Sequence, residues 1–461
     1  MVAAQRRRVL VVSNDVVGRA MAGPGIRYFH FAQELSRSHD VTLLAPEAVD
    51  VGLDGVETRS WRGLRRRDLL ALCSSCAAVV AQHLPPLVMR DLARLPVRVV
   101  YDLYDPYLLE NLPFYAADSP GAAEQAELRA GALLQQIALA TGDAFVCASE
   151  RQRDLWLGML AALERVDLDR YRGDEELRGL VDVVPFGCEV EPPRATRPAL
   201  KGVVPGIRHE DTLLLWGGGV WNWLDPLTPI RAVARLAERR DDVKLAFLGL
   251  ARPNPDVAQM AMARRAVELA DELGVRDRHV FFNFGWVPYD ERADHLLEAD
   301  LGVSAHLNTV EARFAFRTRV VDYLWAGLPV LATRGDALAE LVRERGLGRE
   351  LEFGDVDGWA VAIETLVDDR AAYEKARARI AEVRAELVWP HVVEPLVRLL
   401  DAPPSHAPGA RRIDALVLRH LLERARVIRE RNGIGGLARH GALAVALKAG
   451  LKRETDLRRR G

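Results

Sequence analysis

The stretch Glu311–Asp336, EARFAFRTRVVDYLWAGLPVLATRGD, joins a predicted helix beginning at Arg317 to a buried strand over 329–333. The first amide groups of a helix are unpaired and the helix dipole is positive there, so this helix start favours an anion. Arg317 and Arg319 add two guanidinium groups, whose fork of N–H donors suits a diphosphate. Asp322, one turn further in, is placed to accept hydrogen bonds from vicinal hydroxyl groups such as those of a ribose. The alternative is an ordinary ion pair at a solvated helix start.

Length and composition limit the classes of protein that this chain can form. Its 461 residues, 49% of them hydrophobic, suffice for two domains. The formal net charge of −2 argues against a nucleic-acid partner. Four cysteines are too few for a disulfide framework, so we expect a cytoplasmic protein. No apolar run approaches the roughly 18 residues of a membrane span.

Short apolar runs rich in β-branched residues alternate with helical patterns along most of the chain. This alternation predicts parallel α/β sheets. We expect two doubly wound, Rossmann-like domains, 1–195 and 206–388, that face a cleft. A proline- and glycine-rich linker separates them. The predicted strands are 9–13, 41–45, 78–82, 97–102, 144–148 and 181–185 in the first domain, and 211–219, 243–250, 279–286, 300–306, 329–335 and 349–354 in the second.

The C-terminal segment 411–461 differs from the rest, with 14 Lys and Arg against five Asp and Glu. Its apolar residues follow a helical spacing with arginines opposite, which predicts a basic amphipathic helical tail. Three roles remain open: packing on the protein itself, contact with a membrane surface, or binding of a protein partner. The predicted apolar stripe consists of Ile413, Leu416, Val417, Leu421, Ala425 and Ile428.

Two glycine-rich turns each follow the first strand of a domain. Gly23 and Gly25 in the first domain, and Gly218 and Gly219 in the second, would let the backbone approach a phosphate closely. Trp221 and Asn222 follow the second turn, where an aromatic ring could stack on a base or a sugar. The alternatives are loop geometry without a ligand in the first turn, and packing across the cleft in the second.

The order and spacing of several motifs resemble the GT-B glycosyltransferases of family 4, within them a bacterial subgroup that assembles surface glycans or glycoconjugates. The motifs are VVDYLWAGLPVLAT, GGGVWNWLDP and FGWVPYDERADHLLEADLGVSAH, and agreement extends to about residue 400. The family's second glutamate, which binds the ribose, corresponds to Asp322. Its first glutamate corresponds to Phe314, so Glu311 is the candidate substitute. The resemblance also implies that helix 389–401 crosses back to the first domain.

The resemblance implies transfer of a sugar from a nucleoside diphosphate sugar, with retention, to a sugar-bearing or lipid-linked acceptor held mainly by the first domain. It also implies a cytoplasmic enzyme, with a peripheral position on the inner face of the membrane as an alternative. We expect no cofactor and no catalytic metal ion. The catalytic candidates are Tyr104, Asp105 and Glu311. The donor-binding candidates are Gly23, Gly25, Gly218, Gly219, Trp221, Asn222, Trp286, Arg317, Thr318, Arg319 and Asp322.

Two other functions stay open. A sugar-nucleotide epimerase of the same fold needs a carboxylate or histidine on each side of the reacting carbon, and the candidates are Asp102, Asp105, Glu110 and Glu311. A catalytically inactive nucleotide-sugar-binding scaffold is favoured by Phe314 and by the absence of the family's Arg/Lys pair after the first strand of the second domain.

Overall fold

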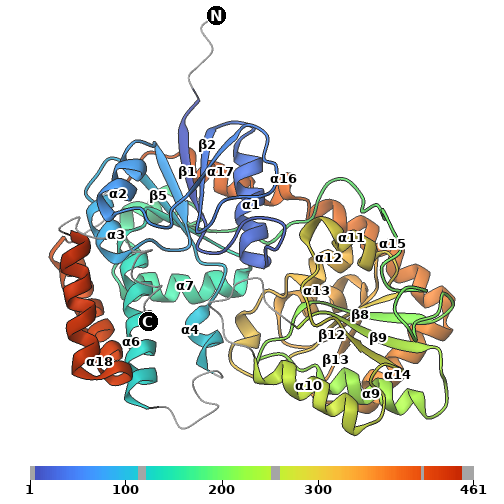
Figure 1. The fold of residues 1–461 in the computed structure, drawn as a ribbon. Helices are drawn as coiled ribbons and strands as arrows, with labels where there is room; N and C mark the ends of the chain where they lie inside the picture. Colours follow the sequence, from blue (N-terminus) through green and yellow to red (C-terminus); the bar gives the residue numbers. More distant parts are fainter. Residues whose placement is uncertain (1–5, 113–120, 251–259, 406–409, 449–461) are drawn as a thin grey trace, which may run out of the picture.

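The computed structural model describes residues 6–112, 121–250, 260–405 and 410–448, and it contains two α/β domains that lie side by side (Figure 1). Each domain is built on one parallel sheet with helices packed on it. The expected fold class is therefore confirmed.

The first domain has a seven-stranded sheet in the order β3-β2-β1-β4-β5-β6-β7. All six strands predicted in this half are present. The edge strand β3 was missed, because its sequence VETRS is almost entirely exposed and carries no apolar pattern. The strands are β1 Arg8–Val12, β2 Asp40–Ala45, β3 Val56–Ser60, β4 Ala78–Ala81, β5 Arg98–Asp102, β6 Ala144–Cys147 and β7 Val181–Val183; the helices are α1 Gly23–Leu35, α2 Arg66–Ser74, α3 Pro86–Leu92, α4 Tyr107–Glu110, α6 Ala122–Thr141, α7 Glu150–Ala162 and α8 Leu168–Gly173.

The second domain has a six-stranded sheet in the order β10-β9-β8-β11-β12-β13, and all six predicted strands are present. The strands are β8 Thr212–Gly219, β9 Val243–Gly249, β10 Val280–Phe282, β11 Leu301–Ser304, β12 Val330–Thr333 and β13 Gly348–Leu351; the helices are α9 Leu227–Ala237, α10 Ala261–Glu272, η1 Tyr289–Glu291, α11 Arg292–Leu296, η2 Ala312–Phe314, α12 Arg319–Trp325, α13 Ala337–Arg345, α14 Val356–Asp368 and α15 Arg370–Glu386.

The side chain of Tyr323 holds helix α12 against the sheet through hydrogen bonds. The Tyr323 hydroxyl donates to a carbonyl of β8 or β11, since it lies 2.9 Å from Leu215 O and 2.8 Å from Val303 O, and it accepts from Gly217 N at 2.7 Å. A Cβ atom at Gly302 would lie 2.3 Å from the Tyr323 ring, so only glycine admits the ring there. The helix begins at Arg319, with Thr318 as its N-cap, two residues later than predicted.

The chain returns to the first domain through α16 Trp389–Val392 and α17 Glu394–Asp401. Arg98 on β5 donates to Leu399 O and Pro403 O, each at 2.9 Å, so α17 packs on the first sheet. The two crossing segments also bind each other: Cys188 N donates to Leu387 O at 2.8 Å, and Trp389 N donates to Cys188 O at 3.0 Å.

The last described helix, α18 Ala410–Lys448, lies along α6, and its backbone leaves the helical conformation at Gly433. Ile413, Leu416 and Val417 are buried in the core of the first domain. This part of the predicted stripe therefore packs on the protein itself, which was one of the three roles left open.

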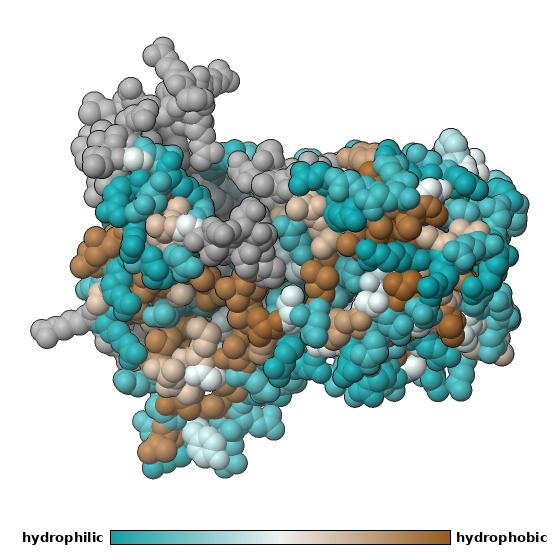
Figure 2. Space-filling view, turned by 90° about the horizontal axis from the view of Figure 1, so that it is seen from below, coloured by the Kyte–Doolittle hydropathy of each residue, from teal (hydrophilic) through white to brown (hydrophobic). Residues whose placement is uncertain are grey.

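The predicted stripe is wrong at Leu421, which is 44% exposed, and the buried face continues through His420 and Val427 instead. The polar ring of His420 can be buried at low cost because its Nδ1 atom donates a hydrogen bond to Ala130 O at 2.9 Å. Leu421 is adjacent in sequence and therefore points about 100° away around the helix. Leu418, Leu421 and Leu422 are all exposed, and Figure 2 shows apolar residues interspersed with hydrophilic ones on the lower face of the molecule.

We expect Leu416→Ala to lower the free energy of unfolding by about 2–4 kcal/mol, because truncating a buried leucine leaves a cavity. Leu418→Ala, on the same helix but 59% exposed, is the matched control and should change it by less than about 0.5 kcal/mol. Urea unfolding of the full chain, followed by circular dichroism, measures both. Equal effects of the two variants would contradict the packing of α18 on α6.

Candidate functional site

The loop after β5 meets the start of the η2–α12 region across the two domains. Gln152 on α7 connects them, because its Nε2 donates to Tyr104 O at 2.7 Å and to Phe314 O at 2.8 Å. Tyr104 belongs to the first domain and Phe314 to the second. One buried amide thus holds together the two loops from which the catalytic candidates were predicted.

A cluster of buried charges lies at this junction. Arg317 Nη2 is 2.7 Å from Glu311 Oε2, and Arg317 Nε is 3.9 Å from Asp336 Oδ2. Burial raises the pKa of Asp105 to about 6, and the nearby charge of Glu311 adds to the shift. Burial and the Asp105 carboxylate raise the pKa of Glu110 well above its usual value. First-domain carboxyl groups therefore face an ion pair of the second domain.

Two oxygens of this cluster are available to a ligand. Asp105 Oδ1 and Glu311 Oε1 are buried and have no hydrogen-bond partner among the described residues. Asp105 and Glu110 each shift the pKa of the other, so the two carboxyl groups titrate as a coupled pair. A site of this kind offers both a proton donor and a negative charge to a bound molecule.

Tyr104 contributes differently from the other two catalytic candidates. Its ring packs 5.4 Å from the Phe186 ring and 5.2 Å from the Arg27 guanidinium. Arg27 in turn binds Asp102 through two bonds of 2.7 and 2.9 Å, with both side chains fully buried. The structure thus joins Asp105 to Glu311, places Tyr104 in aromatic packing beside them, and fixes Asp102 in an ion pair.

The two arginines of the opening stretch have different environments. Arg317 is paired with Glu311, whereas Arg319 has no ion pair with a carboxylate among the described residues. Arg319 Nη2 donates to Gly219 O at 2.9 Å, and its guanidinium lies 4.5 Å from the Trp216 ring. Burial lowers the pKa of Arg319 to about 10, and its Nη1 lacks a partner among the described residues. The Arg319 guanidinium group therefore has no carboxylate partner among the described residues.

The glycine turns close around Arg319 and Thr318. Gly218 has a φ of +75°, which favours glycine, and Gly219 supplies the carbonyl that binds Arg319. A Cβ atom at Gly23 would lie 3.5 Å from Thr318 Oγ1, so the first-domain turn reaches the N-cap of α12. Gly25 has a local role instead, since a Cβ there would lie 2.1 Å from Val16 O.

The aromatic candidates pack beside the second turn. Trp286 lies against Gly249 and Gly219, where a Cβ atom would come within 2.9 Å and 3.7 Å of its ring, respectively. The Trp221 and Trp223 rings stack with centroids 5.2 Å apart. Asn222 is engaged elsewhere: its Oδ1 accepts from Met262 N at 3.1 Å, at the start of α10.

Asp322 remains accessible, with 40% of its side chain exposed, and its Oδ1 is 3.5 Å from Arg292 Nε. Arg292 also donates to Glu189 Oε1 at 2.8 Å and lies over the rings of Tyr289 and Trp325. The predicted ribose carboxylate is thus oriented by Arg292, the first residue of α11. Arg292 lies within the motif FGWVPYDERADHLLEADLGVSAH, but nothing in its position along the chain predicts its contact with Asp322.

Other residues of the site were also missed. Gln152, His306 and Asp336 come from three separate helices or strand ends. None was predicted as a site residue, although His306 ends the motif FGWVPYDERADHLLEADLGVSAH and Asp336 ends the stretch Glu311–Asp336. His306 is buried, and burial together with Arg317 lowers its pKa to about 3, so its ring is neutral. Asp336 caps α13 by accepting from Leu338 N and Ala339 N, each at 2.8 Å. A carboxylate at the end of a strand, followed by a helix, is the sequence signal that could have identified it.

Comparisons with known proteins agree with this architecture. Residues 211–369 match the family described as glycosyl transferases group 1. D-inositol 3-phosphate glycosyltransferase of Mycobacterium ulcerans (strain Agy99) is 28% identical over 228 residues, which is 47% of this chain and 44% of the relative. The protein of the same name from Mycobacterium marinum (strain ATCC BAA-535 / M) is 25% identical over 224 residues, again 47% and 44%. The chain spans less than half the length of these curated relatives.

Solved structures share the fold over both domains. Sucrose-phosphate synthase from Thermosynechococcus elongatus has a TM-score of 0.58 at 14% identity, covering 86% of this chain and 98% of that one. HepE of Anabaena, solved with UDP and glucose, has a TM-score of 0.60 at 11% identity, covering 86% and 99%. The expected GT-B fold is confirmed, and residues 211–369 of the second domain are similar to the glycosyl transferases group 1 family.

None of the helices in the described part of the chain combines the length and apolar character needed to cross a membrane. Among the same residues, His, Cys, Asp and Glu side chains form no group of three or more that could hold a metal ion.

We expect Asp105→Asn to stabilise the protein by about 1–3 kcal/mol at pH 8, because the buried carboxylate is charged there at a cost. The pKa of Asp105 is about 6 in the folded chain, above its ordinary value of 3.8. Between these two values the carboxyl group ionises more readily in the unfolded chain than in the folded chain, so the free energy of unfolding falls as the pH rises. The gain should shrink toward zero at pH 4. Urea unfolding at pH 4, 6 and 8 measures it.

The matched control is Asp154→Asn, which changes an exposed carboxylate on α7. Its effect should vary little over the same pH range. A gain for Asp105→Asn that is equal at pH 4 and pH 8 would show that the Asp105 carboxyl group is not a buried, titrating group.

Proposed function

We propose that this protein is a glycosyltransferase that moves a sugar from a nucleoside diphosphate sugar to an acceptor. The observation that carries the proposal is Arg319, a buried cation without a carboxylate partner, located at the glycine turn of a domain from the glycosyl transferases group 1 family. A diphosphate supplies the charge that Arg319 lacks. The sugar attached to that diphosphate would lie toward Asp105 and Glu311.

The reaction needs groups that are complementary to charge in the transition state. Breaking the anomeric bond places negative charge on the departing diphosphate, which Arg319, the backbone at Gly218–Gly219 and the N-cap at Thr318 stabilise. Positive charge develops on the sugar ring, which the Glu311 carboxylate faces. Gln152 keeps the two loops together, and closure of the domains excludes water from the intermediate.

Arg317 has a supporting role in this proposal instead of the direct one predicted from sequence. Its guanidinium binds Glu311 and lies near Asp336, so it holds the Glu311 carboxylate in one orientation. Asp322 binds the ribose hydroxyls, and Arg292 orients it. Trp286 and Trp221 form an aromatic wall near Gly219 on which a base can stack.

UDP is the first nucleoside diphosphate to test. HepE was solved with UDP and glucose, and the trehalose-6-phosphate structure from E. coli contains UDP-2-fluoro glucose. We further propose that transfer proceeds with retention and without a divalent metal, on a sugar-bearing or lipid-linked acceptor at the cytoplasmic side of the membrane. Activity that persists in excess chelator would support the metal-independent part.

Incubation with a panel of nucleotide sugars tests the proposal directly. A transferase releases the nucleoside diphosphate, and does so faster with an acceptor. An epimerase instead produces a new nucleotide sugar without release, and an inactive scaffold binds the nucleotide without turnover. The buried Arg27–Asp102 pair disfavours the epimerase, because it removes one carboxylate from the groups that could act on the sugar.

Arg319→Ala should weaken binding of a nucleoside diphosphate by about 1.5–3 kcal/mol, because it removes a charge-assisted hydrogen bond to the diphosphate. Isothermal titration calorimetry measures the change. Arg278→Ala is the matched control, since this exposed arginine precedes β10 at the amino end of the sheet, away from the site. Unchanged affinity in Arg319→Ala would remove the central support for the proposal.

Asp322→Ala should abolish discrimination between a nucleoside diphosphate and its 2′-deoxy analogue. In the wild type the analogue should bind about 1–3 kcal/mol more weakly, because the carboxylate loses a hydroxyl partner. Asp322→Asn, which still accepts one hydrogen bond, should keep part of the difference. If the wild type binds both nucleotides equally, Asp322 does not bind the ribose.

A further inference from the structure

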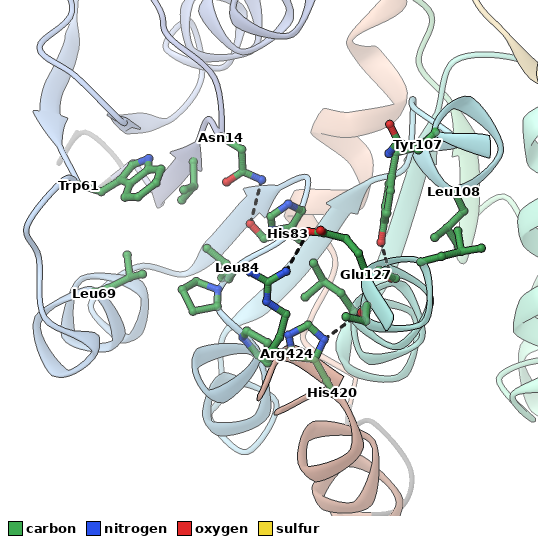
Figure 3. Close-up of a pocket in the computed structure, with 18 residues that line it drawn as sticks. Asn14, Trp61, Leu69, His83, Leu84, Tyr107, Leu108, Glu127, His420 and Arg424 are labelled. Carbon is green, nitrogen blue, oxygen red and sulfur yellow. Dashed lines mark hydrogen bonds and ion pairs between the residues drawn. The ribbon is translucent and has the colours of Figure 1, made fainter. Parts of the chain in front are cut away.

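A cavity of about 410 Å³ lies in the first domain at the carboxyl ends of β1 and β4 (Figure 3). Its walls come from the loops after these strands, from α4 and α6, and from the tail helix α18. The volume falls within the range of about 300–1,000 Å³ found for small-molecule sites. None of the donor-binding candidates lines it.

The cavity is lined mainly by apolar side chains. Two aromatic rings form opposite parts of the wall, and their polar atoms are already used: Trp61 Nε1 donates to Ser13 O at 2.9 Å, and the Tyr107 hydroxyl donates to Gly131 O at 2.7 Å. The rings therefore offer apolar surface to an occupant. The aliphatic part of the lining is Val12, Leu69, Leu84, Leu108, Leu128 and Leu134.

The polar groups of the cavity are neutral or already paired at pH 7. Burial lowers the pKa of His83 to about 4 and also lowers that of His420. His420 Nδ1 lies 2.9 Å from Ala130 O, and because a carbonyl only accepts, Nδ1 carries the hydrogen and Nε2 is an acceptor. Arg424 is bound to Glu127 at 3.1 Å. A phosphate or carboxylate in this cavity would find no unpaired cation to bind. An uncharged apolar body needs no such partner, because its binding buries no ionised group.

Helix α4 connects this cavity to the carboxylate cluster. Its four residues run from Tyr107 to Glu110 and directly follow Asp105 and Pro106. Burial and the Asp105 carboxylate raise the pKa of Glu110, so Glu110 belongs to the cluster, whereas Tyr107 and Leu108 line the cavity. One helical turn therefore separates the place where a sugar would be transferred from an apolar chamber.

We propose that the acceptor is amphiphilic, with a hydroxyl-bearing head at Asp105 and an uncharged apolar body in the cavity between α4, α6 and α18. This inference rests on the proposed glycosyltransferase function and names its acceptor class. The tail helix has a specific part in it, because His420 and Arg424 form one wall and lie beyond the region matched to the family. The apolar body can be a hydrocarbon chain or a fused ring.

Three glucosides with the same head and different aglycones test the proposal: methyl, octyl and 2-naphthyl β-D-glucoside. Calorimetric titration of the full chain, with the octyl compound below its critical micelle concentration, gives their affinities. We expect the octyl or the naphthyl compound to bind at least about tenfold tighter than the methyl compound, because its apolar surface leaves water. The tighter of the two shows whether the body is a chain or a ring.

Leu128→Trp and Leu108→Trp fill the cavity from α6 and α4, respectively, at half-buried positions. Each should abolish the preference for the apolar aglycone and leave the affinity for a nucleoside diphosphate unchanged. Leu421→Trp is the matched control, because it makes the same substitution on the exposed face of α18, and it should keep the preference. Circular dichroism melting identifies any variant that does not fold.

Equal binding of all three glucosides by the wild type would overturn the inference, as would a preference that survives both cavity-filling variants. These results are separable from a failure of the proposed function. If the apolar glucosides bind in the cavity but no nucleotide sugar is turned over, the site stands and the glycosyltransferase proposal fails. If transfer occurs but the aglycone has no influence, only the acceptor class is wrong.

Discussion

Two backbone hydrogen bonds, Cys188 N to Leu387 O and Trp389 N to Cys188 O, join the two segments on which the chain crosses between its domains. A Cβ atom at Gly187 would lie 2.9 Å from Trp389 N, so glycine permits this close approach. Because the two crossings are tied together and α17 is bound to the first sheet, the carboxyl ends of both sheets meet at one cleft. The contacts of Gln152 with Tyr104 and Phe314 depend on that meeting.

The cleft holds charges that do not balance locally. Arg317 is compensated by Glu311, but Arg319 lacks a carboxylate, and Asp105 and Glu110 are buried next to each other. Such an arrangement costs stability, since each buried charge loses hydration and only some regain it through a partner. In the proposed function, the negative diphosphate of the donor compensates Arg319, which gives a physical reason for keeping this arrangement at a binding site.

The tail helix shows how a peripheral segment can shape a binding site. Ile413, Leu416 and Val417 anchor α18 to the first domain, while His420 and Arg424 complete a cavity wall. A basic amphipathic helix is typical of a membrane-surface element. In the described part of α18, however, the buried face packs against α6. In the inference proposed above, α18 contributes to function because it encloses part of the cavity that holds the apolar body of the acceptor.

The sequence by itself determined the twelve predicted strands, because a strand buried between helices must be apolar along its length. It also located Glu311, Arg319 and Asp322 through one loop and one short helix. It could not show that Arg317 and Arg319 differ, because a carboxylate six residues earlier binds the first while a carbonyl a hundred residues away binds the second. Nor could it show that Arg292 orients Asp322, that Glu110 pairs with Asp105 beside Glu311, or that His420 is buried where Leu421 was expected. Local propensity and periodicity depend on neighbours in the chain, whereas ion pairing, desolvation and cavities depend on neighbours in space, which only the tertiary structure decides.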